Sequence, residues 1–355
     1  MAPIRSNTQP DLIIRLLQPN DGPELIQLFE SSPDNGRFAI NARYQIDPYQ
    51  AIHALHSDTI GIAAEIQGSL VGLGLVEFGD CCVRGERRPY ASLHSLLVHP
   101  SYRNKGIAKR LAQERITLAR ERIGESGLIL ASIQENNSAS LSVAQKWSQQ
   151  QVGSIQSILT RVRNQAPAPS PEGITVRPAQ PGEYAEIATG LNRFYQGYDL
   201  YELQTAESLS AWLNKTPFDD PLRHYFIAVN RDEEIMAGLA VTRQCQIMAM
   251  EVKRMPLPLT MLNKIMKMVP EDGVLRQLSV TRVWYAPEQL TAAQHLWETV
   301  RWQSRVWGTH ITCFYDPRSS VPDVLRVSKW LPRANFTVVS TGSQPIGGER
   351  LIYPL

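Results

Sequence analysis

LHSLLVHPSYRNKGIAKRLAQERITLARER, residues 93–122, is the stretch of this sequence that decides the fold. Residues 93–98 predict a strand, and apolar side chains recur at helical spacing from Ile107 onwards. The short basic turn 103–108 joins the two. Its glycine, Gly106, lets the backbone bend without a Cβ, so several peptide N–H groups can converge where the helix begins. Because those amides coincide with the positive end of the helix dipole, the turn is suited to bind a phosphate or pyrophosphate.

The turn reads R-x-x-G-x-A and follows V-x-P-x-Y at residues 98–102. This combination resembles motif A of the GCN5-related N-acetyltransferase (GNAT) superfamily, whose pattern is Q/R-x-x-G-x-G/A. The resemblance implies that the turn amides hold the pyrophosphate of coenzyme A and that the end of the preceding strand binds the pantetheine and the acetyl carbonyl. The coenzyme-binding residues that it implies are Leu96, Leu97, Val98, Arg103, Asn104, Lys105, Gly106, Ile107, Ala108 and Lys109. The competing interpretation is an ordinary strand–turn–helix unit with a basic surface turn.

The composition is that of an ordinary globular protein. The 355 residues carry a formal net charge of +2, with 43% hydrophobic and 20% charged side chains, so the chain has no electrostatic footprint for nucleic acid. No apolar run approaches the roughly 20 residues that cross a bilayer, and residues 1–12 lack the apolar core of a signal peptide. The four cysteines show no C-x-x-C spacing. We therefore expect a cytoplasmic protein with reduced thiols, no metal site, and neither a membrane nor a nucleic-acid partner.

Strand and helix patterns alternate on both sides of the turn. Before the turn we expect a helix at 23–29, a polar loop at 79–88, and strands at 12–17, 59–66, 69–78 and 90–98. After it we expect helices at 107–123 and 136–147 and strands at 128–133 and within 152–163. This alternation predicts an α/β (α+β) fold, which the resemblance specifies as a mixed, mostly antiparallel sheet flanked by helices.

A second unit follows the first. Residues 164–173 include three prolines and show no apolar period, which indicates an extended linker. The openings at 13–29 and 173–191 then share the order strand, turn, helix. We therefore expect two tandem GNAT-like domains, one at 10–163 and one at 174–355. This order is weakly similar to the HOOKLESS-type N-acetyltransferases of plants.

The second unit departs from motif A where the basic turn should recur. The sequence there is YAPEQL, residues 285–290, which has no glycine and no positive charge. Glu288 is negative, so a pyrophosphate would meet fewer amides and an opposing charge. We expect this half to be degenerate and to bind no coenzyme.

Acetyl transfer from a thioester to an amine requires that the amine lose a proton and that the carbonyl be polarised. The resemblance implies that a strand-end amide near Leu97 or Val98 faces the acetyl oxygen and polarises the carbonyl. His94 shares a strand face with Leu96 and Val98. The run L-H-S-L-L-V-H is similar to L-H-A-L-A-V-H of the serotonin N-acetyltransferases, whose first histidine is a catalytic candidate. His94 is the predicted base, since a neutral histidine accepts an ammonium proton. The alternatives are a hydrogen-bonded core histidine and a different base, Glu77, on a central strand.

The general acid is the main departure from the family. Many GNAT enzymes carry N-x-x-A-x-x-x-Y in the helix after the fifth strand, with the tyrosine near the sulfur. Aligning Asn137 with that asparagine places Ser140 at the alanine and Ala144 at the tyrosine. Asn137 is thus expected either to contact pantetheine or only to cap its helix. Because Ala144 has no proton to give, water, another tyrosine or the C-terminal domain would have to serve.

The resemblance implies an acetyl-CoA-dependent N-acetyltransferase, in which an amine attacks bound acetyl-CoA directly. The alternative, motivated by the missing tyrosine, is a noncatalytic acyl-CoA-binding sensor or regulatory protein. The acceptor is expected to be a small-molecule or peptide amine, with Phe38, Tyr44 and Tyr49 as candidate contacts. The sequence leaves open the acceptor's identity, the acyl-chain length and the oligomeric state.

Overall fold

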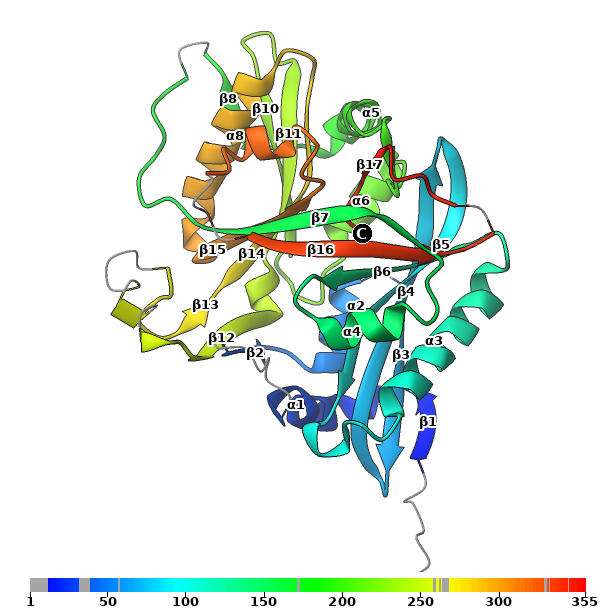
Figure 1. The fold of residues 1–355 in the computed structure, drawn as a ribbon. Helices are drawn as coiled ribbons and strands as arrows, with labels where there is room; N and C mark the ends of the chain where they lie inside the picture. Colours follow the sequence, from blue (N-terminus) through cyan, green and yellow to red (C-terminus); the bar gives the residue numbers. More distant parts are fainter. Residues whose placement is uncertain are drawn as a thin grey trace, which may run out of the picture.

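One sheet of 12 strands extends across both parts of the chain, with helices on its faces (Figure 1). The computed structural model describes residues 12–31, 39–56, 58–170, 173–257, 260–261, 263, 268–328, 331, 333–343 and 345–355. The first half, residues 12–163, supplies β1 (Leu12–Leu16), β3 (Thr59–Ile66), β4 (Ser69–Val83), β5 (Glu86–Val98), β6 (Leu128–Gln134) and β7 (Gln150–Arg161). The second half, residues 174–355, supplies β8 (Thr175–Pro178), β10 (Arg223–Val229), β11 (Ile235–Thr242), β14 (Gln277–Tyr285), β15 (His310–Tyr315) and β16 (Arg333–Thr341).

The two halves exchange the last strand that each contributes to this sheet, β7 from the first half and β16 from the second. The order across the sheet is β1-β3-β4-β5-β6-β16-β7-β15-β14-β11-β10-β8. β16 therefore lies between β6 and β7, where Thr337 pairs with Ile133 on one side and with Ser154 on the other. β7 in turn lies between β16 and β15 and is antiparallel to both. Neither half completes its sheet alone, so backbone hydrogen bonds hold the halves together as firmly as neighbouring strands of one domain.

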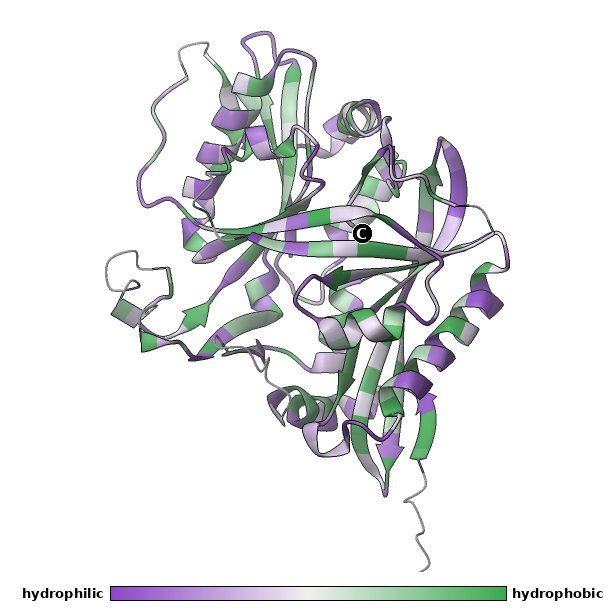
Figure 2. Ribbon diagram, in the orientation of Figure 1, coloured by the Kyte–Doolittle hydropathy of each residue, from purple (hydrophilic) through white to green (hydrophobic). Residues whose placement is uncertain are grey.

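Helices cover the sheet, and two small sheets join its parts. The helices are α1 (Gly22–Ser31), α2 (Pro48–Leu55), α3 (Ile107–Ile123), α4 (Ser138–Ala144), α5 (Tyr184–Phe194), α6 (Ala206–Asn214), α8 (Leu290–Gln303) and α9 (Val321–Val324). The small sheets pair β2 (Ala39–Tyr44) with β12 (Met248–Arg254) and β13 (Val274–Leu275), and β9 (Tyr198–Asp199) with β17 (Leu351–Ile352). Hydrophobic residues concentrate on the strands, whereas α3 carries hydrophilic residues along much of its length (Figure 2). Within the described residues, every helix is too short or too polar to span a bilayer.

The polar loop expected at 79–88 is wrong, because this segment continues as strand. β4 and β5 form one long hairpin whose tip, Arg84 and Gly85, turns in the left-handed region with φ of 53° and 85°. The arm rests on the second half: the Cys82 N–H donates to the Tyr201 carbonyl (2.8 Å) and the Arg84 N–H to Asp199 Oδ1 (2.7 Å). These partners lie more than a hundred residues away in sequence, so the local pattern could not reveal them.

Helix α3 packs closely on β4 because the residues of β4 that face the helix include glycines. A Cβ on Gly74 would lie 2.7 Å from the Arg115 side chain. Arg115 itself is only 4% exposed and donates from Nη1 to the carbonyl of His94 (3.0 Å). The helix thus fixes the backbone of β5 at His94, immediately before the strand changes direction.

Candidate active site

The strands β5 and β6 separate in the middle of the first half. Their parallel pairing covers only Tyr90–Ser92 against Leu128–Leu130, although both strands continue beyond it. At the same level β5 has a bulge: Leu75 pairs with His94 and Leu73 with Leu97, which leaves two residues of β5 opposite Gly74 alone. The bulge contains Ser95, whose φ is +53°. A bulge bends its strand and increases the twist, so it accounts for the divergence of β5 from β6.

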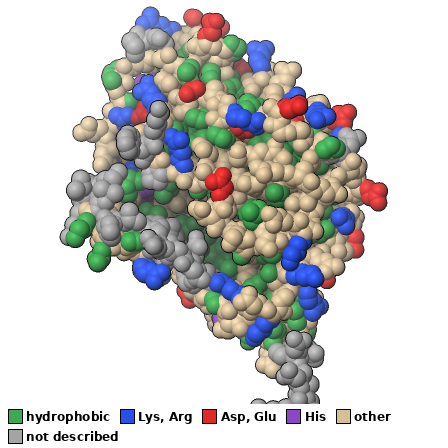
Figure 3. Space-filling view, in the orientation of Figure 1, with side chains coloured by type: hydrophobic (Ala, Val, Ile, Leu, Met, Phe, Trp, Pro, Cys, Tyr) green, Lys and Arg blue, Asp and Glu red, His purple; other side chains and the backbone are tan. Residues whose placement is uncertain are grey.

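The basic turn lies at the far end of β5. Gly106 has φ +79°, and a Cβ there would meet no atom within 4 Å, so the turn is open. The first helical bond of α3 runs from the Arg110 N–H to the Gly106 carbonyl (3.1 Å), and the amides of Ile107, Ala108 and Lys109 therefore precede it. Lys and Arg side chains gather over the region of α3 in Figure 3. The structure thus brings the predicted turn amides and the strand end 96–98 into one continuous segment with an exposed corner.

Two basic side chains of this corner are ordered by local contacts. Arg103 turns back on the strand and donates from Nε to the Val98 carbonyl (3.2 Å). The Lys105 ammonium lies 4.8 Å from the centre of the Tyr102 ring, a distance typical of a cation–π contact. Because these partners, a carbonyl and an aromatic ring, are uncharged, Arg103 and Lys105 keep their positive charge beside the N-terminus of α3.

Asn137 lies at the start of α4. Its Oδ1 accepts a hydrogen bond from the Ser140 N–H (3.0 Å), which makes it the N-cap of the helix, and the side chain is exposed. Ala144 is 3% exposed and packs in the core beside β6. The structure shows the capping role of Asn137; its predicted contact with pantetheine stays a prediction.

The predicted base, His94, belongs to a cluster of three titratable side chains. His56 Nδ1 lies 2.8 Å from Glu77 Oε2, and His94 Nε2 lies 3.9 Å from the same oxygen. The two histidine rings are 4.7 Å apart. Glu77, the second candidate base from sequence, is thus the member that both histidines approach. The sequence analysis missed His56, which follows the last turn of α2 and carries no motif.

The cluster has a defined protonation pattern. Burial alone would raise the pKa of Glu77, but the hydrogen bond from His56 and the charge of the nearby Lys215 lower it below its usual value. Burial, together with the nearby His56, lowers the pKa of His94 to about 4. At neutral pH Glu77 is therefore ionised and His94 neutral. Since a carboxylate only accepts hydrogen bonds, Nδ1 of His56 carries the proton in the contact with Glu77.

A buried arginine fixes this cluster relative to the second half. Arg223, 5% exposed, donates to the carbonyls of Ala54 (2.9 Å) and Leu55 (3.4 Å) at the end of α2. It also donates to the carbonyls of Trp212 (3.3 Å) and Lys215 (2.6 Å) at the end of α6. His56 directly follows Leu55, so its position depends on a helix end that both halves hold.

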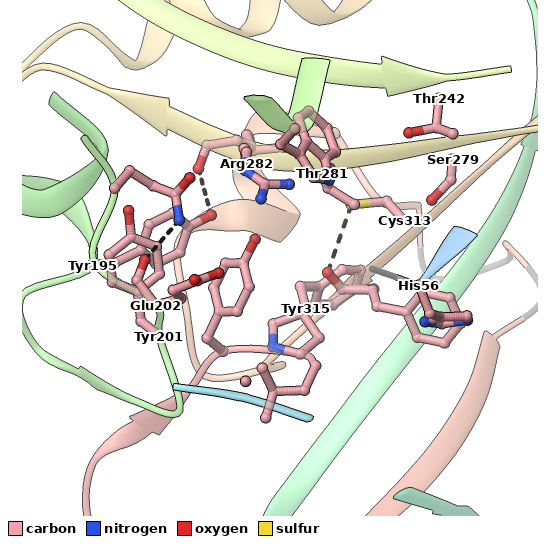
Figure 4. Close-up of a pocket in the computed structure, with 18 of the residues that line it drawn as sticks. His56, Tyr195, Tyr201, Glu202, Thr242, Ser279, Thr281, Arg282, Cys313 and Tyr315 are labelled. Atoms are coloured by element: carbon pink, nitrogen blue, oxygen red, sulfur yellow. Dashed lines mark hydrogen bonds between the residues drawn. The ribbon is translucent and has the colours of Figure 1, made fainter. Parts of the chain in front are cut away.

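The cluster opens onto a cavity between the halves with a volume of about 440 Å³. From the first half it is lined by Leu55, His56, Glu77, Phe78, Gly79 and Tyr90. The second half contributes the diverging ends of β14 and β15 and an aromatic wall that includes Tyr195, Tyr201 and Trp212. Figure 4 shows His56 at one side of this cavity, with Tyr195, Tyr201 and Glu202 at the other. Such a volume suits a small molecule or the end of a peptide.

Two of the aromatic residues proposed from sequence as acceptor contacts, Tyr44 and Tyr49, lie outside this cavity. Tyr44 packs against Phe29 with ring centres 5.1 Å apart, and Tyr49 against His53 at 4.3 Å. Neither lines the cavity between the halves. Phe38 lies outside the described residues.

The second half lacks the basic corner. The segment between β14 and α8 contains Glu288, whose φ is +65° without a glycine, and its side chain is exposed. The Ala286 N–H already donates to the Met236 carbonyl (2.8 Å), and the Gln289 N–H to the Ala286 carbonyl (3.0 Å). Amides that would face a pyrophosphate are thus partly used within the fold.

Residues 24–148 match the sequence profile of the Acetyltransferase (GNAT) family. No curated protein sequence matches the chain. The fold is similar to a GCN5-related N-acetyltransferase from Sphaerobacter thermophilus, with a TM-score of 0.60, 14% identity, and coverage of 95% of this chain and 98% of the other. It is also similar to Saccharomyces cerevisiae N-myristoyltransferase with bound myristoyl-CoA (TM-score 0.64, 10% identity, coverage 95% and 80%). A third similar structure is a GCN5-related N-acetyltransferase from Kribbella flavida (TM-score 0.52, 12% identity, coverage 93% and 71%).

Proposed function

We propose that this chain, whose residues 24–148 match the GNAT family profile, is an acyl-CoA-dependent N-acyltransferase that uses acetyl-CoA and an amine acceptor. In this proposal it consists of two tandem GNAT-like domains, of which the first binds the coenzyme. The observation that carries the proposal is the joint placement of three features on β5. The open amide corner ends the strand, the bulge at Ser95 turns it away from β6, and the Glu77 cluster lies beside the point of divergence.

The corner would bind the pyrophosphate and the diverging strand would hold the pantetheine and the thioester. The amides of Ile107, Ala108 and Lys109 precede the first helical bond, so they have no partner within α3 and can donate to phosphate oxygens. The backbone near Leu97 and Val98 is free of β6, since the pairing of the two strands ends at Ser92. An amide there can donate to the carbonyl oxygen and stabilise the charge that develops on it.

The amine would approach from the cavity between the halves. His56 Nε2 accepts the proton of the attacking amine, and Glu77 holds the imidazole in the required tautomer and stabilises the imidazolium that forms. The nitrogen then attacks the thioester carbon, the new C–N bond replaces the C–S bond, and the thiolate leaves. His94 acts in this proposal through Glu77, from which it is 3.9 Å away. With Ala144 buried in the core, water supplies the proton to the departing thiolate.

The alternative function, a noncatalytic acyl-CoA sensor, gives a different result in one experiment. Coenzyme A release from acetyl-CoA is followed with a thiol reagent in the presence of a panel of amines. We expect acetyl-CoA to bind with a micromolar Kd and at least one amine to stimulate thiol release. Binding at that affinity without stimulation by any amine would support the sensor instead. Longer acyl-CoA donors in the same assay decide the acyl-chain length.

The Glu77 cluster is also the one group of described residues whose donor atoms could hold a metal ion, since they all lie within 4.8 Å of one another. Two histidines and a carboxylate are ligands that zinc accepts. The 2.8 Å contact between His56 and Glu77, however, is a hydrogen bond that a metal ion would have to replace. We expect thiol release to be unchanged by prior dialysis against EDTA and to be inhibited by added Zn²⁺. A rate that EDTA abolishes and Zn²⁺ restores would show instead that the cluster works as a metal centre.

A further inference from the structure

In the second half, the wall of the cavity contains a strand divergence and a bulge like those of β5 and β6 in the first half. β14 pairs with β15 only over Gln277–Val280, and beyond this the two strands diverge as β5 and β6 do. The pairing of β14 with β11 is interrupted by a bulge at the same place, which contains Arg282 with φ +52°. Arg282 therefore occupies in the second half the position that Ser95 occupies in the first. The small hydroxyl side chain of Ser95 in the first half thus corresponds to the long, positively charged side chain of Arg282 in the second.

Buried hydroxyl groups hold this bulge in place. The Tyr195 hydroxyl donates to the Val283 carbonyl (2.6 Å), and the Tyr225 hydroxyl donates to the Arg282 carbonyl (3.1 Å). Tyr225 is in turn fixed by the Trp284 indole N–H, which donates to its hydroxyl (2.9 Å). Burial raises the pKa of both tyrosines, so they remain donors at neutral pH. Because the backbone is clamped, the direction of the Arg282 side chain is set by the fold.

The Arg282 side chain lines the cavity near the Glu202 carboxylate, with which it interacts electrostatically without forming an ion pair in the described residues. Its guanidinium lies 3.6 Å from the centre of the Trp212 ring. Among the described residues none forms a hydrogen bond or an ion pair with this guanidinium, although the residue is half-buried. Arg223, which also lines the cavity, contrasts with it, because its guanidinium is occupied by four carbonyls. The Thr281 hydroxyl, next to Arg282 and also lining the cavity, is buried and likewise has no partner in the described part of the chain.

An unpaired, stacked guanidinium beside an unpaired hydroxyl is a site for a planar anion. A guanidinium presents donors in a fixed fork that matches a carboxylate, and stacking on an indole holds the fork in place. The cavity also contains carboxylates, Glu202 near Arg282 and Glu77 at the His56 side. Both signs of charge thus face one space of about 440 Å³.

We propose that the acceptor is zwitterionic: a carboxylate of the acceptor binds Arg282 and the Thr281 hydroxyl, and its amine faces His56 and Glu77. Amino acids and the carboxyl-bearing ends of short peptides have this chemistry and fit the volume. The inference rests on the proposed function, because it names the substrate class of the same site. It assigns the degenerate half a role in substrate recognition in place of coenzyme binding.

The test uses the full chain and compares pairs of acceptors that differ only in whether they carry a negatively charged carboxylate. Thiol release is measured with α-amino acids, ω-amino acids of increasing length and a dipeptide, each beside its carboxamide. We expect kcat/KM of the preferred carboxylate to exceed that of its carboxamide by about 10- to 100-fold, the range of one charge-assisted hydrogen-bonded contact. Arg282→Gln should remove this preference and leave the carboxamide within about threefold of wild type, while Arg282→Lys should restore part of it. Arg276→Gln is the matched control, since Arg276 is exposed and paired with Asp272 near the same strand.

Equilibrium binding of the same compounds, followed by saturation-transfer NMR, gives a result that does not depend on turnover. Carboxylate binding by wild type and Arg276→Gln, but not by Arg282→Gln, supports the inference even if no amine is acylated. The absence of acylation with every amine would refute only the proposed function. Equal use and equal binding of carboxylates and carboxamides, or a preference that survives in Arg282→Gln, overturns the inference and leaves the acyltransferase intact.

Discussion

Glu77→Gln is expected to lower kcat for amine acylation by about 100-fold, within the range that a positioned general base contributes, while the Kd of acetyl-CoA stays within twofold of wild type. The amide keeps the size of the side chain and can still accept from His56, which lies 2.8 Å away. It cannot stabilise the imidazolium, because it carries no charge. Stopped-flow or steady-state thiol release at saturating acetyl-CoA measures the rate, and calorimetry measures coenzyme affinity.

The control for this substitution is Glu65→Gln on the neighbouring strand β3. Glu65 is also a paired carboxylate, with Arg15, and its side chain is 20% exposed against 21% for Glu77. The control removes the same charge away from the cavity, so we expect full activity. His56→Ala and the double variant with Glu77→Gln should be about equally slow, since residues that act as one unit are not additive. His94→Ala should reduce the rate less than either, with unchanged coenzyme affinity. A Glu77→Gln enzyme as fast as Glu65→Gln would leave the cluster a purely structural role.

Gly106→Glu is expected to lower the affinity for acetyl-CoA by roughly 30- to 10,000-fold, which corresponds to a loss of about 2–6 kcal/mol. Two effects add. A non-glycine residue at φ +79° strains the turn by about 1–2 kcal/mol, and a carboxylate near a pyrophosphate opposes it by about 1–4 kcal/mol at 4 Å. A Cβ added at Gly106 would meet no atom within 4 Å, so no steric clash adds to the backbone strain. Isothermal titration with acetyl-CoA measures the loss, and Gly106→Ala, which adds the strain without the charge, should lose only about tenfold.

Gly85→Glu is the matched control for backbone strain and charge. Gly85 has φ +85° and is exposed, and a Cβ added there would likewise meet no atom within 4 Å. It lies, however, at the opposite end of the β4–β5 hairpin from the basic corner. The coenzyme affinity of this variant should equal that of wild type. Retained affinity in Gly106→Glu, or an equal loss in both variants, would contradict the placement of the pyrophosphate at this corner.

Features of this fold that depend on neighbouring residues in the sequence could be predicted, whereas features that depend on contacts between distant residues could not. The strand, the turn and the helix at 93–122 were predicted correctly because their signals, apolar periodicity and a glycine at a left-handed position, are local. The extent of the β4–β5 hairpin was not, because its arm is stabilised by Tyr201 and Asp199 of the other half. Likewise, a strand such as β16 carries no mark of whether it will pair within its own half or between β6 and β7.

The candidate site divides in the same way. The strand–turn–helix geometry at 103–109 was predictable from sequence, since a contiguous backbone segment suffices to present amides, and His94 and Glu77 were named as candidates; their roles stay predictions. The contact of Glu77 with His56, and the cavity that both share with Arg282, were visible only in the three-dimensional structure. Side chains from distant segments meet only after the strands have paired, and the exchange of β7 and β16 joins the two halves into one sheet.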